Sequence, residues 1–181
     1  MKDCMTDLET LGTTPQTVTV SLGAVFFDIE KKCLGPSFYM IMDVNEQIAR
    51  GRKPTGDTLK WWMSQADAAK RVFHEKAKPM KEVLTLFVQW YSANYPKGAY
   101  VWGNGSTFDI SILEDLFRDY GIECPWGYNK IMDLRTFKRF NKAGLAGLHD
   151  MPRRTRICDR NGTRARTHQR LGRPDARQRA C

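Results

Sequence analysis

The chain contains no long apolar run, and its few cysteines form no recognisable spacing pattern. No stretch of its 181 residues approaches the roughly 20 consecutive apolar residues of a transmembrane helix. The opening MKDCMTD lacks the apolar core of a secretion signal, so we expect a cytoplasmic protein with no membrane partner. The five cysteines are odd in number and scattered, which excludes a dense disulfide scaffold and the close pairs of a zinc site. We expect reduced thiols.

The end of the chain lacks several residue types altogether. Residues 151–181 contain no Phe, Trp, Tyr, Lys or Glu, and they hold ten Arg against two Asp. Residues 1–150 hold 19 Lys and Arg against 18 Asp and Glu, so the net charge of +9 belongs mainly to the end. Such a segment cannot bury enough apolar surface to offset its ordering entropy. We therefore expect a folded domain at 1–147 and a disordered, Arg-rich tail at 148–181.

Three early segments are rich in β-branched and aromatic residues. Residues 3–9, 18–29 and 37–44 each predict a strand, and KKCLGP between the last two is typical of a turn. Consecutive strands with short connections indicate an antiparallel meander.

Helical patterns follow. Asp57 is placed to cap TLKWWMSQ, and residues 80–95 show amphipathic helical spacing. Residues 99–105 predict a buried strand that ends in a glycine turn, after which Ser106 or Thr107 is placed to cap the helix FDISILEDLFRDYG. NKIMDLRTFKRF predicts a last strand and helix. The order of elements indicates an α/β fold with a sheet of mixed direction.

Two acidic patterns are candidates for chemistry. Asp7 and Glu9 stand two apart on a strand, so they share a face about 7 Å apart along the chain, where hard ions such as Mg²⁺ or Mn²⁺ accept carboxylate ligands. Asp109 follows the glycine loop in the first turn of a helix. Each pattern also has a structural explanation, because Asp-x-Glu is common on exposed strands and acidic residues complement helix N-termini.

The segments DLETLG, VSLGAVFFD, DTLKWW and VWGNGSTFD stand in this order in the chain. Together they resemble the DEDD 3′-to-5′ exonucleases, and most closely a phage and bacterial branch with paired tryptophans and a WGNG loop. The resemblance covers residues 1 to about 147. It implies a ribonuclease H-like mixed sheet flanked by helices, a single-stranded RNA or DNA 3′ end as substrate, and a homodimer as in many relatives.

The resemblance also implies roles for particular residues. It makes Asp7 and Glu9 the first exonuclease motif and Asp109 the second, so that they hold two divalent ions, Mg or Mn, about 4 Å apart at the scissile phosphate. Asp133 is a lesser candidate that is equally well explained as a capping acid. The residues that the resemblance places against the substrate are Thr10, Leu11, Asn104 and Phe108.

The third exonuclease motif, a His-x4-Asp or Tyr-x3-Asp near the C-terminus, is absent from this reading frame, because no His or Tyr stands at the required spacing before a late Asp. His149 directly precedes an Asp, and His168 precedes Asp175 by seven residues. His74 comes far too early and is expected at the surface. The general base for the attacking water is therefore missing, and we expect impaired catalysis and the loss of the last helix.

A frameshift near residues 141–150 would explain both the missing motif and the odd composition. Back-translation of RTHQRLGRP (166–174), read from the second base of each codon, permits Ala-His-(Thr/Ile)-(Asn/Ser)-Ala-Leu-Asp-Asp, which contains His-x4-Asp. The alternative is a genuine Arg-rich arm that binds nucleic acid through its phosphates.

Two other functions fit the sequence. One is a non-catalytic nucleic-acid-binding protein that uses the residual groove and the basic tail. The other is a polymerase-associated proofreader, although no polymerase-binding motif is visible in the sequence.

Overall fold

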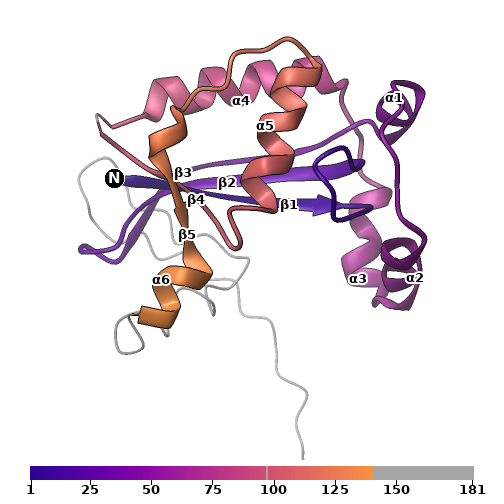
Figure 1. Cartoon of the computed structure of the whole chain (residues 1–181), viewed down its shortest axis with the longest axis horizontal. Helices are drawn as coiled ribbons and strands as arrows, with labels where there is room; N and C mark the ends of the chain where they lie inside the picture. Colours follow the sequence, from indigo (N-terminus) through magenta and orange to yellow (C-terminus); the bar gives the residue numbers. More distant parts are fainter. Residues whose placement is uncertain (97, 141–181) are drawn as a thin grey trace, which may run out of the picture.

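A mixed five-stranded sheet forms the centre of the protein (Figure 1). The computed structural model describes residues 1–96 and 98–140. Strands β1 (Asp3–Thr10), β2 (Thr19–Asp28) and β3 (Cys33–Ile41) form an antiparallel meander, while β4 (Val101–Gly103) and β5 (Ile131–Asp133) lie parallel to β1. The strand order is β3-β2-β1-β4-β5. The predicted meander and the mixed α/β sheet are confirmed.

Helices lie on both faces and at one end of the sheet. Figure 1 shows α4 and α5 across one face, α6 on the other, and the α1, α2 and α3 segments at the end to which β1 points. None of the helices in residues 1–96 and 98–140 is long and apolar enough to cross a membrane. The helices are α1 (Val44–Ala49), α2 (Gly56–Ser64), α3 (Asp67–Lys70), α4 (Met80–Asn94), α5 (Asp109–Asp119) and α6 (Leu134–Phe140), with 3-10 turns at Arg71–Phe73 and Tyr128–Lys130.

The main core lies between the sheet and the two long helices. The apolar face predicted for α4 is buried, and it packs with the inward residues of β1 and β2 and with α5. Removing this apolar surface from water supplies the main driving force for folding. The fully buried members from α4 are Met80, Val83, Leu84, Phe87 and Tyr91.

A smaller cluster holds α6 against the opposite face. Leu134 packs with Phe27 and Trp102, and the rings of Trp102 and Phe137 meet edge to face with centroids 5.3 Å apart. This contact places the start of α6 below β4, close to the loop that follows that strand.

Several predicted boundaries are wrong. β3 begins at Cys33, so part of the predicted turn is strand, and the strand ends before Asp43. Asp43 Oδ1 accepts the backbone N–H groups of Asn45 and Glu46, which caps α1, a helix that the sequence analysis did not predict. The hydrogen bonds from the Asp43 side chain to the backbone favour a helix start at this point, where the apolar pattern had predicted a strand.

Two predicted helix caps are also wrong. Thr55, rather than Asp57, precedes α2, and Asp57 lies in its first turn. Neither Ser106 nor Thr107 caps α5, which begins at Asp109 after Phe108. The carbonyl of Gly105 accepts the N–H groups of both Phe108 and Asp109, so the chain is still turning where a helix was expected. The predicted loss of a last helix and the predicted tail at 148–181 lie outside the described residues.

Candidate active site

β1 carries Asp7 and Glu9 toward the end of the sheet. Burial alternates along the strand, with Thr6, Leu8 and Thr10 buried, Asp7 exposed and Glu9 half-buried. The two acids therefore share the face opposite α4 and α5, as their spacing predicts.

Asp109 lies in the same region, although it is about 100 residues from Asp7 in the sequence. It begins α5 after the loop that follows β4, and only 3% of its surface is exposed. Its Oδ1 atom accepts the backbone N–H of Leu8 at 3.3 Å, directly beside Asp7. A Cβ atom on Gly103 would lie 3.3 Å from Asp109 Cβ and 3.4 Å from its Oδ2, so the glycine permits this close packing. The fold thus brings two carboxylates together, one on β1 and one at the start of the helix that follows the adjacent parallel strand β4.

Burial and the negative charge of Asp7 both change the pKa of Asp109. The pKa of Asp109 is raised to about 6, first by burial and then by the nearby charge of Asp7. The backbone N–H groups of Leu8 and Asn104 and the charge of Arg135 oppose this rise. Two carboxylates that repel each other in a partly desolvated site fit the hard oxygen ligands that Mg²⁺ and Mn²⁺ prefer.

The set of three metal ligands, Asp7, Glu9 and Asp109, stays a prediction. Within residues 1–96 and 98–140, no group of three or more acidic, histidine or cysteine side chains is arranged to hold a metal ion. Asp7 and Asp109 form the interacting pair, and Glu9 lies two residues farther along β1, in the wall of a groove.

This groove lies beside the acidic pair and has a volume of about 420 Å³. Thr10 and Phe108, two of the residues that the resemblance places against the substrate, line it. Leu11 and Asn104 do not: Leu11 is buried in a small core with Trp62, and Asn104 contributes its backbone N–H toward Asp109. The groove is lined by Leu8, Glu9, Thr10, Gly12, Thr13, Asp57, Thr58, Trp61 and Phe108.

The paired tryptophans of α2 occupy different positions, which the apolar pattern of the helix did not predict. Trp62 is buried, and its Nε1–H donates to the carbonyl of Thr10 at 2.8 Å, which ties α2 to the end of β1. Trp61 is 52% exposed, meets Trp62 edge to face at 5.0 Å and lines the groove. Successive residues on a helix differ by about 100° in direction, so the two rings point to different sides of α2. This difference is visible in the sequence, but only packing decides which of the two rings is buried.

Asp133 has a structural position. Its Oδ2 accepts the N–H of Ser106 at 2.6 Å, and its Oδ1 accepts the N–H of Thr136 at 2.7 Å. It thereby joins the end of β5 to the loop after β4 and caps α6, in agreement with the capping interpretation.

His74 is exposed, as expected, whereas His149 and His168 lie outside the described residues.

Comparisons with known proteins agree with this geometry. The chain is 24% identical over 136 residues to the exodeoxyribonuclease of Enterobacteria phage T4, which covers 66% of this chain and 57% of the phage protein. E. coli exonuclease I, in a metal-free complex with single-stranded DNA and in a complex with a dT13 oligonucleotide, matches with TM-scores of 0.58 and 16% identity. Each match covers 78% of this chain and 30% of exonuclease I. The chain thus spans little more than half of the phage relative and less than a third of the bacterial one.

The likeness to exonuclease I shows that the fold is ribonuclease H-like, as the resemblance implied. The family model described as the 3′-5′ exoribonuclease Rv2179c-like domain matches residues 2–167. Because that match extends over most of the 181 residues, the chain belongs to the 3′-5′ exoribonuclease Rv2179c-like family, a family of DEDD-type 3′-5′ exonucleases.

Proposed function

We propose that this protein removes nucleotides from the 3′ ends of single-stranded RNA or DNA in a reaction that depends on two divalent ions, Mg or Mn. The observation that carries the proposal is the acidic pair formed by Asp7 on β1 and Asp109 at the start of α5, where burial and the charge of Asp7 raise the pKa of Asp109 beside an open groove. The family membership supports the same chemistry.

Asp7, Glu9 and Asp109 would hold the metal ions. When bound, such ions activate the attacking water and stabilise the leaving 3′ oxygen. Asp109 is fixed for this role because its Oδ1 accepts the Leu8 N–H and its side chain packs against Gly103. Asp7 is exposed on the open face of β1, where a phosphate can reach it.

The groove would receive the end of the nucleic acid strand. Trp61 and Phe108 offer aromatic surfaces, and base stacking on such surfaces does not depend on sequence. Single-stranded DNA is bound in the exonuclease I structures, which supports a single-stranded substrate for this chain as well. The family description names an exoribonuclease and the phage relative an exodeoxyribonuclease, so we propose both RNA and DNA as substrates.

Catalysis should be slow. After Asp109 the sequence has no His-x4-Asp or Tyr-x3-Asp motif, so we expect the fourth metal ligand and the general base to be missing in this frame. General-base help is worth about 10²- to 10⁴-fold in rate, and we expect a loss of at least this order relative to an intact relative.

The test is an oligonucleotide labelled at its 5′ end and incubated with Mn²⁺. A 3′-to-5′ exonuclease shortens it from the unlabelled end and leaves a ladder of labelled products. Asp7→Asn should abolish the ladder. Asp3→Asn is the matched control, because Asp3 lies on the same strand and accepts the Tyr100 N–H, which Asn can also accept. Equal turnover by the wild type and Asp7→Asn would refute the proposal.

A non-catalytic nucleic-acid-binding protein is the second candidate, favoured by the ten Arg at 151–181 and by the missing third motif. It predicts that the oligonucleotide stays intact while its binding is the same for the wild type and Asp7→Asn. A cytoplasmic location and a homodimer also stay predictions.

A further inference from the structure

Arg135 lies over the glycine loop next to the acidic pair. It belongs to the first turn of α6, and its side chain is exposed. A Cβ atom on Gly105 would lie 3.2 Å from both Cζ and Nη1 of Arg135. Gly105 has a φ of +111°, so this position favours glycine for its backbone as well as for the close approach of the guanidinium.

Asp133 holds this arrangement in place. Its two carboxylate oxygens accept the N–H groups of Ser106, next to Gly105, and of Thr136, next to Arg135. The start of α6 and the loop are therefore fixed to each other at the residues next to Gly105 and Arg135. An arginine held by its surroundings loses less side-chain entropy when it binds a ligand.

The positive charge of Arg135 acts on Asp109 from a distance. Arg135 lowers the pKa of Asp109, so it lies within electrostatic range of that carboxylate. No salt bridge links it to a carboxylate among residues 1–96 and 98–140. The planar guanidinium has donors suited to bind two oxygens of one phosphate.

We infer that Arg135 binds a phosphate of the nucleic acid strand at the acidic centre. This inference rests on the proposed function, in which a strand enters the groove. The loop that supports Arg135 at Gly105 also carries Phe108, which lines the groove. The strand would thus place a base against Trp61 and Phe108 and a phosphate against Arg135, which offsets the repulsion between that phosphate and the carboxylates.

The first test measures binding of the full chain to a fluorescent dT10 oligonucleotide with Ca²⁺ at several KCl concentrations. Loss of one phosphate contact on a single strand lowers the slope of log K against log[salt] by about 0.7. Arg135→Gln should show this loss and bind about tenfold more weakly at low salt, whereas Arg135→Lys should retain most of the slope. Lys81→Gln is the matched control, because it removes one charge from an exposed position on α4, across the sheet.

The second test identifies the phosphate. In a series of oligonucleotides that each carry one uncharged methylphosphonate, one linkage near the 3′ end should weaken wild-type binding and leave Arg135→Gln unaffected. Unchanged affinity and salt slope in a folded Arg135→Gln protein would overturn the inference, as would a wild type that does not bind dT10. A protein that binds but does not shorten the oligonucleotide refutes only the proposed exonuclease, because the Arg135 effect is measured on binding.

Discussion

Asp109 carries an electrostatic cost that follows from its position. In the unfolded chain its pKa is near the ordinary 3.8, and in the folded protein burial and Asp7 raise the pKa to about 6. A carboxyl whose pKa is raised by folding stabilises the protein most when it is protonated. That stabilisation is complete below about pH 4 and is lost as the pH rises through 6.

Asp109→Asn should therefore stabilise the metal-free protein at pH 7.5, by roughly 1–3 kcal/mol. The variant and the wild type should have the same stability near pH 4. Urea unfolding in EDTA across this pH range measures the difference, with Asp3→Asn as the control for a carboxyl outside the site. Parallel curves for the wild type and Asp109→Asn would contradict the explanation. Added Mn²⁺ should stabilise the wild type and not the variant.

Asp133 should affect stability rather than chemistry. Asp133→Ala removes the acceptors for the Ser106 and Thr136 N–H groups, and each lost cap or bond costs about 1 kcal/mol. We expect a loss of about 1–3 kcal/mol in the free energy of unfolding. Asp133→Asn, which keeps acceptor oxygen, should lose less. Equal losses in the two variants would argue against the capping role.

At the scale of elements, the two adjacent tryptophans of α2 have different roles, one in binding and one in stability. Trp61→Ala should weaken binding of single-stranded oligonucleotides by about 5- to 100-fold, since stacking contributes about 1–3 kcal/mol per base. Its stability should hardly change, because the ring is 52% exposed. Trp62→Phe should instead lower stability, because it leaves the Thr10 carbonyl without its donor. Fluorescence anisotropy and urea unfolding of both variants check this contrast.

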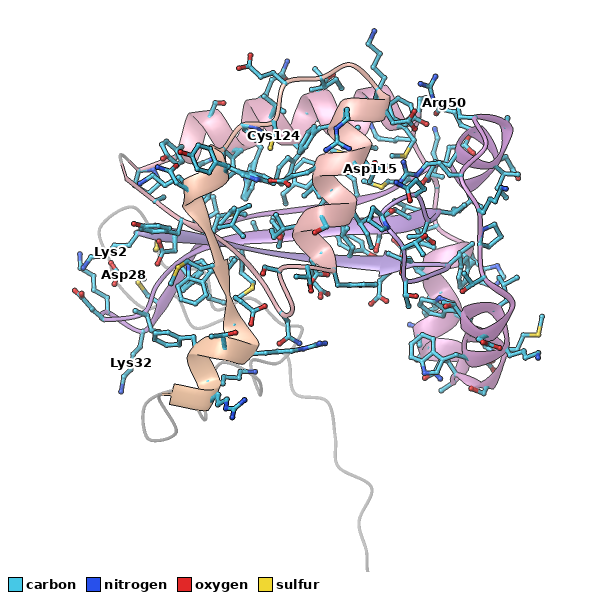
Figure 2. All side chains as sticks on the ribbon, viewed as in Figure 1. Lys2, Asp28, Lys32, Arg50, Asp115 and Cys124 are labelled. Carbon is cyan, nitrogen blue, oxygen red and sulfur yellow. The ribbon has the colours of Figure 1, made fainter. Side chains whose placement is uncertain are left out.

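A buried ion pair connects α5 to the segment between α1 and α2. Arg52 is 5% exposed, and its Nη1 lies 2.9 Å from Asp115 Oδ2, while its Nε donates to the Thr17 carbonyl. Figure 2 shows Asp115 on α5 and Arg50 at the end of α1, near the same corner of the molecule. Arg50 pairs with Asp119 at 3.5 Å in a more exposed setting.

Arg52→Ala should cost about 3–5 kcal/mol of stability, because it leaves a buried carboxylate without its main partner. Arg50→Ala is the matched control and should cost at most about 1 kcal/mol, as exposed pairs do. Urea unfolding measures both. The double variant Arg52→Ala/Asp115→Ala should be less destabilised than the sum of the single variants, and simple additivity would contradict the coupling.

At the scale of the whole molecule, we predict that the sequence at the end of the chain limits the exonuclease activity. If the frame changes near residues 141–150, the nucleotide sequence after codon 140 should encode, in its other frame, an apolar-periodic helix with His-x4-Asp. A protein made from that frame should shorten oligonucleotides about 10²- to 10⁴-fold faster than the present chain. If the other frame lacks this helix, the basic arm is the better explanation of the tail.

The sequence by itself determined the types of most elements and the shared face of Asp7 and Glu9. Alternation with period two placed Asp7 and Glu9 on one face of β1, and helical spacing identified the buried face of α4. These patterns are local, so they are visible within a few residues.

Tertiary structure alone decided the remaining features. Parallel pairing of β1 with β4 brought Asp109 to Leu8, although the two are separated by about 100 residues. Packing also decided that Leu11 is buried, that Trp61 is exposed, and that Arg135 lies on Gly105. Each of these positions depends on contacts between segments that are distant in the sequence, and no periodicity within one segment records such contacts.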